Sequence, residues 1–440
     1  MIVNGGGDAI AGYVYDYSNI LYAAVLFRWC VGVVCENIIA TNGLAGGILT
    51  YQCGSGRITS CKGLNSLYDN GISVNLARYN FDPDDPTTWA NFDISKCEAR
   101  GNAGFGLTSY GAVGVTFRAS LAAGNGNNTP VANPGGDLLP GAGGGMSAEH
   151  NAFGPDGFDH HIAIVNCTIE NNWAAAIFST AEGLRVIGTT MAGSLDPSNY
   201  LAPDAPGQIT QPQYARGDGL VLVNNAVAEV DARSTVIGCA RSPIFMLGNG
   251  VDKYPGLTWG GVAGSTGAPC VISQGVRRMI LETTALLSGS MTQAILVANG
   301  SAGYDPAASI VEMRGRFADH GGVITGIDGV KTVWAYSVEC DNTGFDLASP
   351  GIAIDISDAD LVDVQGVHMT RNDPMFFGVR ALNCTSARIE DVAGSFIVSA
   401  ITSSGSTIVA PTLTDPTDLA TAITAITAIN DLLKDAGRAK

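Results

Sequence analysis

One short segment gathers most of the side chains that could take part in acid–base chemistry. The segment GGGMSAEHNAFGPDGFDHH holds six carboxyl and imidazole groups within thirteen residues: Glu149, His150, Asp156, Asp159, His160 and His161. Hydrolysis of a glycosidic bond uses two carboxyl groups about 5 to 10 Å apart, one as the acid and the other as the nucleophile or base. Proton removal next to a uronate carboxyl needs a base and an acid, and His can serve as either. The catalytic candidates are a carboxylate pair drawn from Glu149, Asp156 and Asp159, with His160 assisting.

Each polar motif also has a purely structural interpretation. The segment around Glu149 is glycine-rich, and its side chains could simply hydrogen-bond their own turns. A second motif, Arg216-Gly-Asp218-Gly, stands beside a proline-rich loop, where it is a candidate for substrate binding or a turn that starts a strand. His320 and His368 stand alone in the sequence and are expected to be structural.

Several aromatic residues lie in or beside irregular segments rather than in the middle of apolar runs. Flat aromatic rings stack on the C–H faces of sugars, so exposed aromatics beside regular strands are typical of a glycan groove. Trp29 and Trp334 stand inside apolar runs and are expected in the core. The substrate-binding candidates are Trp89, Trp173, Trp259 and Tyr254, together with Arg216 and Asp218.

The sequence predicts no metal and no cofactor. Asp355, Asp358, Asp360 and Asp363 resemble a calcium cluster, but no EF-hand or glycine-rich nonapeptide spacing accompanies them. If Asp358 and Asp360 lie on one strand, they share its solvated outer face. No CxxC pair is present, and the glycine-rich stretch before Met146 lacks the lysine of a phosphate loop.

A repeated pattern without helices must position these residues. Cys97 and Cys167 each end an apolar run, are followed by a Gly/Asn corner, and precede Leu107 and Ile177 by ten places. Cys61 precedes Ile72 by eleven. A unit of strand, corner, strand and corner that repeats every 20 to 30 residues or so predicts a β-solenoid.

The same pattern divides the chain into two parts. Residues 1–410 are expected to be the coil, with excursions at 79–89, 121–161, 196–216 and 248–269. Residues 411–440 are expected to hold a helix: Asp415 suits the N-cap, Pro416 the first turn, and Leu419, Ile423, Ile426 and Leu433 one apolar face. That helix either packs on its own coil or joins several chains in a short coiled coil. Six cysteines that end apolar runs are expected as free thiols stacked in one buried ladder: Cys61, Cys97, Cys167, Cys239, Cys340 and Cys384.

Composition excludes several classes of partner. The 440 residues include 57 glycines, only 14% are charged, and the formal net charge is −17 with no basic cluster, so nucleic-acid binding is not expected. The start MIVNGGGDAIAG lacks the features of a signal peptide. The most apolar window, Ile20 to Val34, carries Arg28 and indicates consecutive core strands, so no membrane insertion is expected.

The runs IVNCTIENN and FDISKCEARGNAGFGL resemble the right-handed parallel β-helix, or pectate-lyase-like, family, and most of all the trimeric tailspikes and tail fibres of bacteriophages. The resemblance implies an all-β, single-stranded right-handed parallel β-helix with loop insertions and a short C-terminal helix. It also implies a homotrimeric virion protein, assembled in the host cytoplasm, that binds and often cleaves bacterial surface polysaccharide. A virion adaptor protein is an expected partner at the N-terminus.

Two rival functions remain open. One is a non-enzymatic virion spike, adhesin or structural decoration protein. The other is a polysaccharide lyase or uronate C5-epimerase, because EARGNAGFG is similar to turns of mannuronan epimerases; here, however, Asp159-His160-His161 lacks the proline of their Asp-Pro-His-Asp motif. The sequence therefore predicts a depolymerase of the hydrolase or lyase type, against a rival that only binds.

Overall fold

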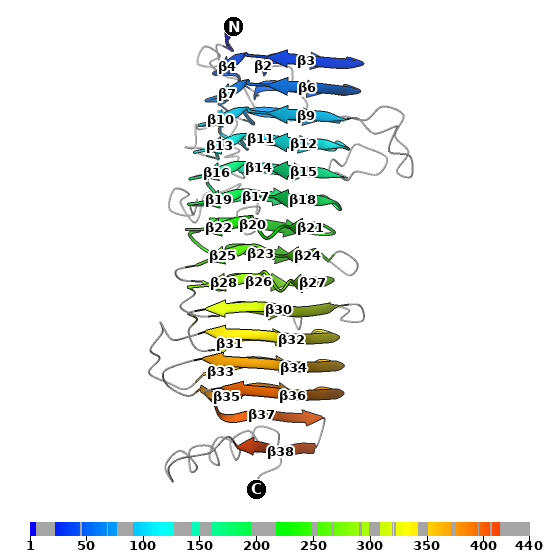
Figure 1. The fold of residues 1–440 in the computed structure, drawn as a ribbon. Coiled ribbons are helices and arrows are strands. Elements are labelled where there is room, and N and C mark those ends of the chain that lie inside the picture. The colour runs from blue at the N-terminus through cyan, green and yellow to red at the C-terminus, as the bar shows by residue number, and fades with distance from the viewer. Residues whose placement is uncertain are drawn as a thin grey trace, which may run out of the picture. The chain divides into compact units, whose positions relative to one another are not determined.

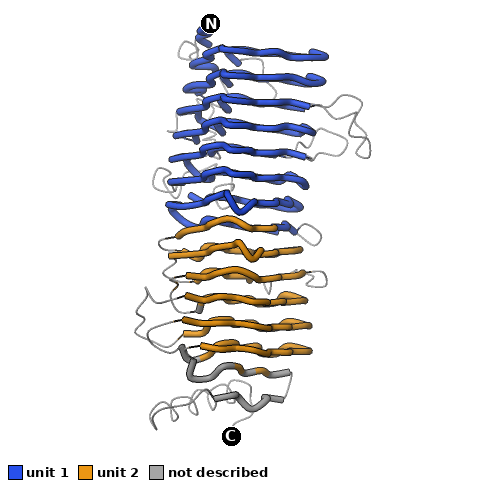
Figure 2. Tube along the Cα trace, in the orientation of Figure 1, with its two compact units in different colours: residues 1–249, 253–257 blue, residues 250–252, 258–440 orange. Residues whose placement is uncertain are grey.

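The computed structural model shows a chain built from short strands. It describes residues 1–5, 23–44, 46–67, 69–76, 91–126, 143–149, 161–194, 217–248, 254–265, 268–289, 293–298, 309–318, 320, 323–341, 351–370, 375–394, 396–404 and 407–413. These residues form strands and turns and no helix (Figure 1). The predicted C-terminal helix lies outside the described residues. Two compact units are distinguished in Figure 2: residues 1–249 with 253–257, and residues 250–252 with 258–440.

In the first unit each coil contributes one strand to each of three parallel ladders, here called a, b and c (Figure 1). Ladder a comprises β3 (Gly32–Glu36), β6 (Ser55–Thr59), β9 (Phe92–Ser95), β12 (Val115–Arg118), β15 (Ile162–Val165), β18 (Leu184–Ile187) and β21 (Val227–Val230). Ladder b comprises β1 (Ile2–Asn4), β4 (Ile39–Thr41), β7 (Lys62–Leu64), β10 (Glu98–Arg100), β13 (Leu121–Ala123), β16 (Thr168–Glu170), β19 (Thr190–Ala192) and β22 (Thr235–Ile237). Ladder c comprises β2 (Ala23–Arg28), β5 (Gly46–Tyr51), β8 (Ile72–Asn75), β11 (Leu107–Tyr110), β14 (Gly144–Glu149), β17 (Ala175–Ser179), β20 (Asp218–Val223) and β23 (Ile244–Leu247).

Parallel pairing of every third strand is the topology of a single-stranded right-handed parallel β-helix, which confirms the predicted fold class. The residues that carried the prediction are in register. Ile72 pairs with Leu107, Leu107 with Met146, and Met146 with Ile177. All four side chains are fully buried, so one apolar row runs up the inside of ladder c.

Small polar side chains line the corner between ladders a and b. Cys97, Ser120 and Cys167 follow one another in successive coils, and each donates to the carbonyl two residues upstream, over 3.4, 2.9 and 3.5 Å. The residue before each of them has a positive φ, near 50°. At this corner, a residue in the left-handed backbone conformation is therefore followed by a small side chain that donates a hydrogen bond, and this pair of residues changes the direction of the chain.

The corner between ladders b and c is built from asparagines. The side-chain oxygen of Asn125 accepts a hydrogen bond from the backbone N–H of Asn102, at 3.2 Å. In the next coil, the side-chain oxygen of Asn172 accepts one from the backbone N–H of Asn125, at 3.0 Å. Side-chain amides also bond to each other, with 2.8 Å from Asn102 to Asn125 and 2.9 Å from Asn125 to Asn172. The ladder satisfies backbone groups that a buried corner would otherwise leave without partners.

All ten cysteines are free, and nine of them are buried, as predicted for thiols of the core. The prediction that six of these cysteines stack in a single ladder is wrong. Cys61, Cys97 and Cys167 share the a–b corner, whereas Cys239 follows β22, Cys340 lies within a strand and Cys384 follows another. Burial raises the pKa of the Cys167 thiol to about 11 and that of Cys340 to about 12, so both stay protonated at neutral pH.

The second unit begins with three short strands per coil and then fuses two of them. Its strands are β24 (Gly256–Trp259, at the boundary between the units), β25 (Val262–Gly264), β26 (Val271–Gln274), β27 (Arg278–Leu281), β28 (Leu286–Ser288), β29 (Ile295–Ala298), β30 (Ile310–Ala318), β31 (Val323–Asp328), β32 (Thr332–Asp341), β33 (Ile352–Ser357), β34 (Leu361–Thr370), β35 (Met375–Leu382), β36 (Ser386–Gly394), β37 (Phe396–Ser404) and β38 (Thr407–Leu413). β30 pairs with both β27 and β28, with a register shift at Gly315, so one long bulged strand replaces two. β38 runs antiparallel to β37 and ends the described coil.

Several expected excursions contain regular structure. Residues 121–161 include β13 and β14, and residues 248–269 include β24 and β25. The glycines that made 121–161 look like a loop have a packing role, because a Cβ on Gly145 would lie 2.2 Å from Cγ2 of Ile169 and 2.9 Å from the Asn172 amide. The excursions 79–89 and 196–216 fall outside the described residues.

Candidate functional site

Glu149 is the predicted catalytic residue that the structure describes. It ends β14, where it pairs in register with Tyr110 of β11; Tyr110 pairs with Asn75, and Asn75 with Tyr51. Residues in register on parallel strands share a face, so these four form a row with one member about every 4.8 Å. All four are half-buried. A polar and aromatic row therefore runs across ladder c at the ends of its strands.

The environment of Glu149 suits proton transfer near neutral pH. The pKa of its carboxyl is raised from a usual 4.5 to about 7. Desolvation is the main cause and the negative charge of Asp69 acts in the same direction, while Ser147 lowers the pKa. A carboxyl with a pKa near 7 is protonated in a large fraction of molecules at neutral pH. It can therefore donate a proton, or accept one once ionised.

A second polar row lies next to the first. Ser73, Thr108 and Ser147 pair in register on β8, β11 and β14, and all three are buried. The Ser73 hydroxyl donates to the Asn75 side chain over 2.5 Å. Ser73 and Asn75 are two positions apart on β8 and therefore share a face, and their hydrogen bond restricts the rotamers of the Asn75 side chain.

The other three catalytic candidates lie outside the described residues: Asp156, Asp159 and His160 belong to 150–160, and Trp89 and Arg216 also fall on residues that are not described. Their assignments stay predictions. His161 begins the next described segment, with a positive φ of 55°.

Asp218 and Trp259 are placed where a ligand does not reach them, which corrects both assignments. Asp218 is fully buried and accepts two hydrogen bonds from Arg241, at 2.7 and 2.5 Å, and one from the Ser242 backbone, at 3.2 Å. It is the first residue of β20, directly after Gly217. Trp259 is also fully buried, and its indole N–H donates to the Gly261 carbonyl at 2.9 Å.

Trp173 and Tyr254 remain half-buried. The Trp173 backbone N–H bonds to the Asn125 carbonyl at the b–c corner, so Trp173 stands before β17 begins. Glu149 instead stands at the far end of its strand. The structure therefore does not gather Trp173 into the row of Glu149.

Two other tryptophans, which were expected in the core, lie at the surface or on an outer face. Trp29 is 65% exposed, with the guanidinium of Arg28 lying 3.9 Å from its ring centroid, and Trp334 is half-buried on the outer face of β32. An apolar run hides which face each residue takes, and one residue at positive φ, as Trp29 is, reverses it. His320 is buried as expected, whereas His368 is exposed on β34. Asp358 and Asp360 lie in the turn between β33 and β34, not on one strand.

Neither a metal cluster nor a membrane-spanning helix is found in the part of the chain that the structure describes. No group of three or more His, Cys, Asp or Glu side chains there is arranged to hold an ion. None of its segments is a helix long and apolar enough to cross a bilayer.

Together, the ladders and the row of Glu149 define a parallel β-helix protein with a titratable carboxyl on one sheet. No protein-family model matches the sequence, and neither does any curated protein. Similar solved structures include the Dettilon tailspike protein, at 13% identity and a TM-score of 0.40, covering 84% of this chain and 60% of that one. The catalytic domain of a GH87 alpha-1,3-glucanase matches at 10% identity and a TM-score of 0.35, covering 80% of this chain and 61% of that one.

A third similar structure is PfbA, a surface protein and adhesin of Streptococcus pneumoniae, at 11% identity and a TM-score of 0.33, covering 80% of this chain and 89% of that one. This chain thus spans about three fifths of the tailspike and of the glucanase domain. At these identities and scores the similarity carries no argument about activity, which has to be argued from the residues themselves.

Proposed function

We propose that this chain is a receptor-binding spike of the phage tailspike type, which recognises bacterial surface polysaccharide and cleaves it. The observation that carries the proposal is Glu149, a carboxyl held near neutral pKa beside Tyr110 on an otherwise regular sheet. Structural carboxylates of this coil, such as Glu98 and Glu229, instead pair with Lys or Arg at the surface. A desolvated carboxyl coupled to another carboxylate, Asp69, is typical of a catalytic acid or base.

In this proposal Glu149 acts as the general acid of a hydrolase, and the second carboxyl comes from Asp156 or Asp159, with His160 assisting. A half-buried tyrosine next to the carboxyl favours one further candidate. In a lyase, ionised Glu149 would remove the proton next to a uronate carboxyl while Tyr110 protonates the leaving oxygen. In an epimerase, Tyr110 would instead return a proton to the opposite face of the same carbon, and no bond between sugars would break. Homotrimer formation, a virion location and an adaptor partner belong to the same proposal.

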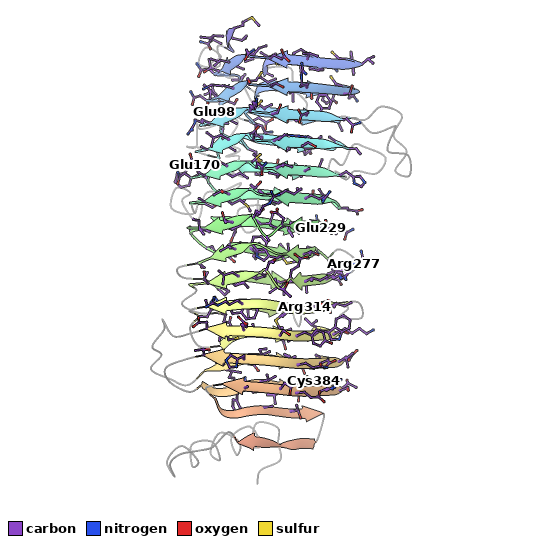
Figure 3. The ribbon with its side chains drawn as sticks, viewed as in Figure 1. Glu98, Glu170, Glu229, Arg277, Arg314 and Cys384 are labelled. Carbon is purple, nitrogen blue, oxygen red and sulfur yellow. The ribbon has the colours of Figure 1, made fainter. Side chains whose placement is uncertain are left out.

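The test is incubation with purified capsule and lipopolysaccharide, with measurement of new reducing ends and of the ultraviolet absorbance of unsaturated uronates. Glu149→Gln is expected to abolish product release, and so is the double change Asp156→Asn with Asp159→Asn. Glu229→Gln is the matched control: Glu229 (labelled in Figure 3) is an exposed carboxylate on β21, 3.7 Å from Arg185, and its variant is expected to keep full activity.

The pH profile separates the two chemistries. A hydrolase that needs protonated Glu149 loses activity as the pH rises through about 7, whereas a lyase that needs its carboxylate gains activity over the same interval. Polysaccharide binding without any product, in wild type and variants alike, would instead establish the non-enzymatic adhesin or decoration protein.

A further inference from the structure

A second surface, in the other unit, combines aromatic rings with hydrogen-bonding side chains. It is the outer face of β30, β32, β34 and β36, where two rows cross the strands in register. Glu312, Trp334, Asp363 and Arg388 form one row, and Tyr336, Gln365 and Glu390 form the other. Here this surface is called the Trp334 face. Arg314, which lies on β30 at its edge, is labelled in Figure 3.

The centre of the Trp334 face is held by its own hydrogen bonds. The Tyr336 hydroxyl donates to one oxygen of Asp363 over 3.1 Å, and the Gln365 amide donates to the other over 3.0 Å. Desolvation and the neighbouring Asp363 raise the pKa of Tyr336, so its hydroxyl stays a donor. The Tyr336 ring, the carboxylate and the amide are thus fixed before any ligand arrives, which lowers the entropy cost of binding.

Two arginine–glutamate pairs border this centre on opposite sides. On β30, Arg314 lies 2.6 Å from Glu312, with 45% of the arginine side chain exposed. On β36, Arg388 bonds to Glu390 through two contacts, at 2.9 and 2.7 Å, with 58% of the arginine exposed. Each guanidinium therefore keeps N–H groups that face water and can donate to a ligand.

The charge of the Trp334 face indicates which ligand it suits. Three carboxylates, on Glu312, Asp363 and Glu390, meet two guanidinium groups, on Arg314 and Arg388, so the face is nearly neutral on a chain of net charge −17. A phosphate or polyuronate would meet a carboxylate on three of the four strands: Glu312 on β30, Asp363 on β34 and Glu390 on β36. A neutral ligand with many hydroxyls finds both donors and acceptors, next to rings that can stack on its C–H faces.

We propose that the Trp334 face is a binding surface for a neutral polysaccharide, separate in its residues from the row of Glu149. The Trp334 ring stacks on a sugar, while Asp363 and Gln365 accept from and donate to its hydroxyls, and Arg388 donates at the far side. The inference takes only its ligand class from the proposed function. It does not require that the chain cleave anything.

The test is affinity electrophoresis of the full chain through gels that contain dextran, galactomannan or laminarin, with polygalacturonate as the anionic comparison. Wild type is expected to be retarded by at least one neutral polymer and not by polygalacturonate. Trp334→Ala is expected to weaken that retardation about tenfold or more, the loss of one good aromatic contact. Trp29→Ala removes an exposed tryptophan from the other unit and is expected to leave the retardation unchanged.

Gln365→Ala is the second variant, because it trims a surface side chain without removing a ring; it is expected to weaken retardation as well. The proposal is overturned if no neutral polymer retards the wild type, or if Trp334→Ala and Gln365→Ala, with unchanged urea midpoints, migrate as wild type does. Glu149→Gln separates the two proposals. This variant should keep retardation while losing cleavage. Retardation of the wild type without any cleavage would instead leave the Trp334 face intact and remove the catalytic assignment.

Discussion

At the scale of single residues, position in the coil decides what a carboxyl group does. Asp218 is fully buried, yet Arg241 and the Ser242 backbone compensate its charge. Glu149 is desolvated, no cation among the described residues lowers its pKa, and that pKa rises to about 7. Both residues come from glycine-rich motifs that look alike in the sequence. Their difference arises from neighbours contributed by other coils.

The raised pKa of Glu149 predicts a pH-dependent cost to stability. Ionising this carboxyl is harder in the folded chain than in the unfolded one, so its contribution is most favourable below about 4.5 and is lost as the pH rises through about 7. The loss is at most roughly 3 kcal/mol, because each pH unit between the two pKa values corresponds to about 1.4 kcal/mol. Glu149→Gln, which cannot ionise, should unfold like wild type at pH 4.5.

At pH 8.5 the same variant should be more stable than wild type by roughly 1 to 3 kcal/mol. Urea denaturation at both pH values, followed by circular dichroism, measures the difference. The exposed Glu229→Gln serves as the control. Equal effects of Glu149→Gln at the two pH values would mean that this carboxyl is solvated after all.

At the scale of the strand and its corners, repeating small residues let the coils approach one another. Gly145 is the second residue of β14, and a Cβ at that position would meet Ile169, the Ala176 carbonyl and the Asn172 amide within 3 Å. Gly32, at the start of β3, has nothing within 4 Å of the same added atom. The two glycines therefore form a matched pair for a packing test.

Gly145→Ala is expected to destabilise the chain by roughly 1 to 3 kcal/mol, because an overpacked corner must shift backbone or the asparagine ladder. Gly32→Ala should change the free energy of unfolding by less than about 1 kcal/mol. Urea midpoints of both variants at one pH make the comparison. A neutral Gly145→Ala would show that the b–c corner has more space than its contacts indicate.

Local spacing explains how much of this architecture could be predicted from the sequence. Ten positions separate Cys97 from Leu107, and ten separate Cys167 from Ile177, because each coil must pass the same two corners. The repeat can therefore be recognised in the sequence. Met146 breaks the pattern, since residues 127–142 separate it from the preceding strand, and the row it completes becomes visible only in the register.

The candidate site could be predicted only in part, for the same physical reason. Glu149 was identified by its residue type, but its partners Tyr110 and Asp69 stand 39 and 80 positions earlier, and no local pattern links them. The Trp334 face was missed because Trp334 and Tyr336 sit among apolar residues. Only the alternation of β32 shows that they face outward while Val333 and Ala335 fill the core.

At the scale of the whole molecule, the last residues predict that several chains act together, and the resemblance to trimeric tailspikes implies that the number is three. Leu419, Ile423, Ile426 and Leu433 would form one apolar face of a helix, which a single exposed helix cannot bury. Light scattering should therefore give three times the chain mass of 45.2 kDa. Replacing both Leu419 and Ile426 by Asp should give the monomer, because charges on that face oppose association.

Thr424→Asp, on the opposite side of the same predicted helix, is the matched control and should leave the trimer intact. The double variant also separates two kinds of site. If the row of Glu149 is complete within one chain, the monomer keeps its rate of sugar release; if a neighbouring chain contributes to it, the rate falls with the loss of the trimer. A wild-type mass of one chain would exclude trimerisation by these residues and favour the alternative in which the helix packs on its own coil.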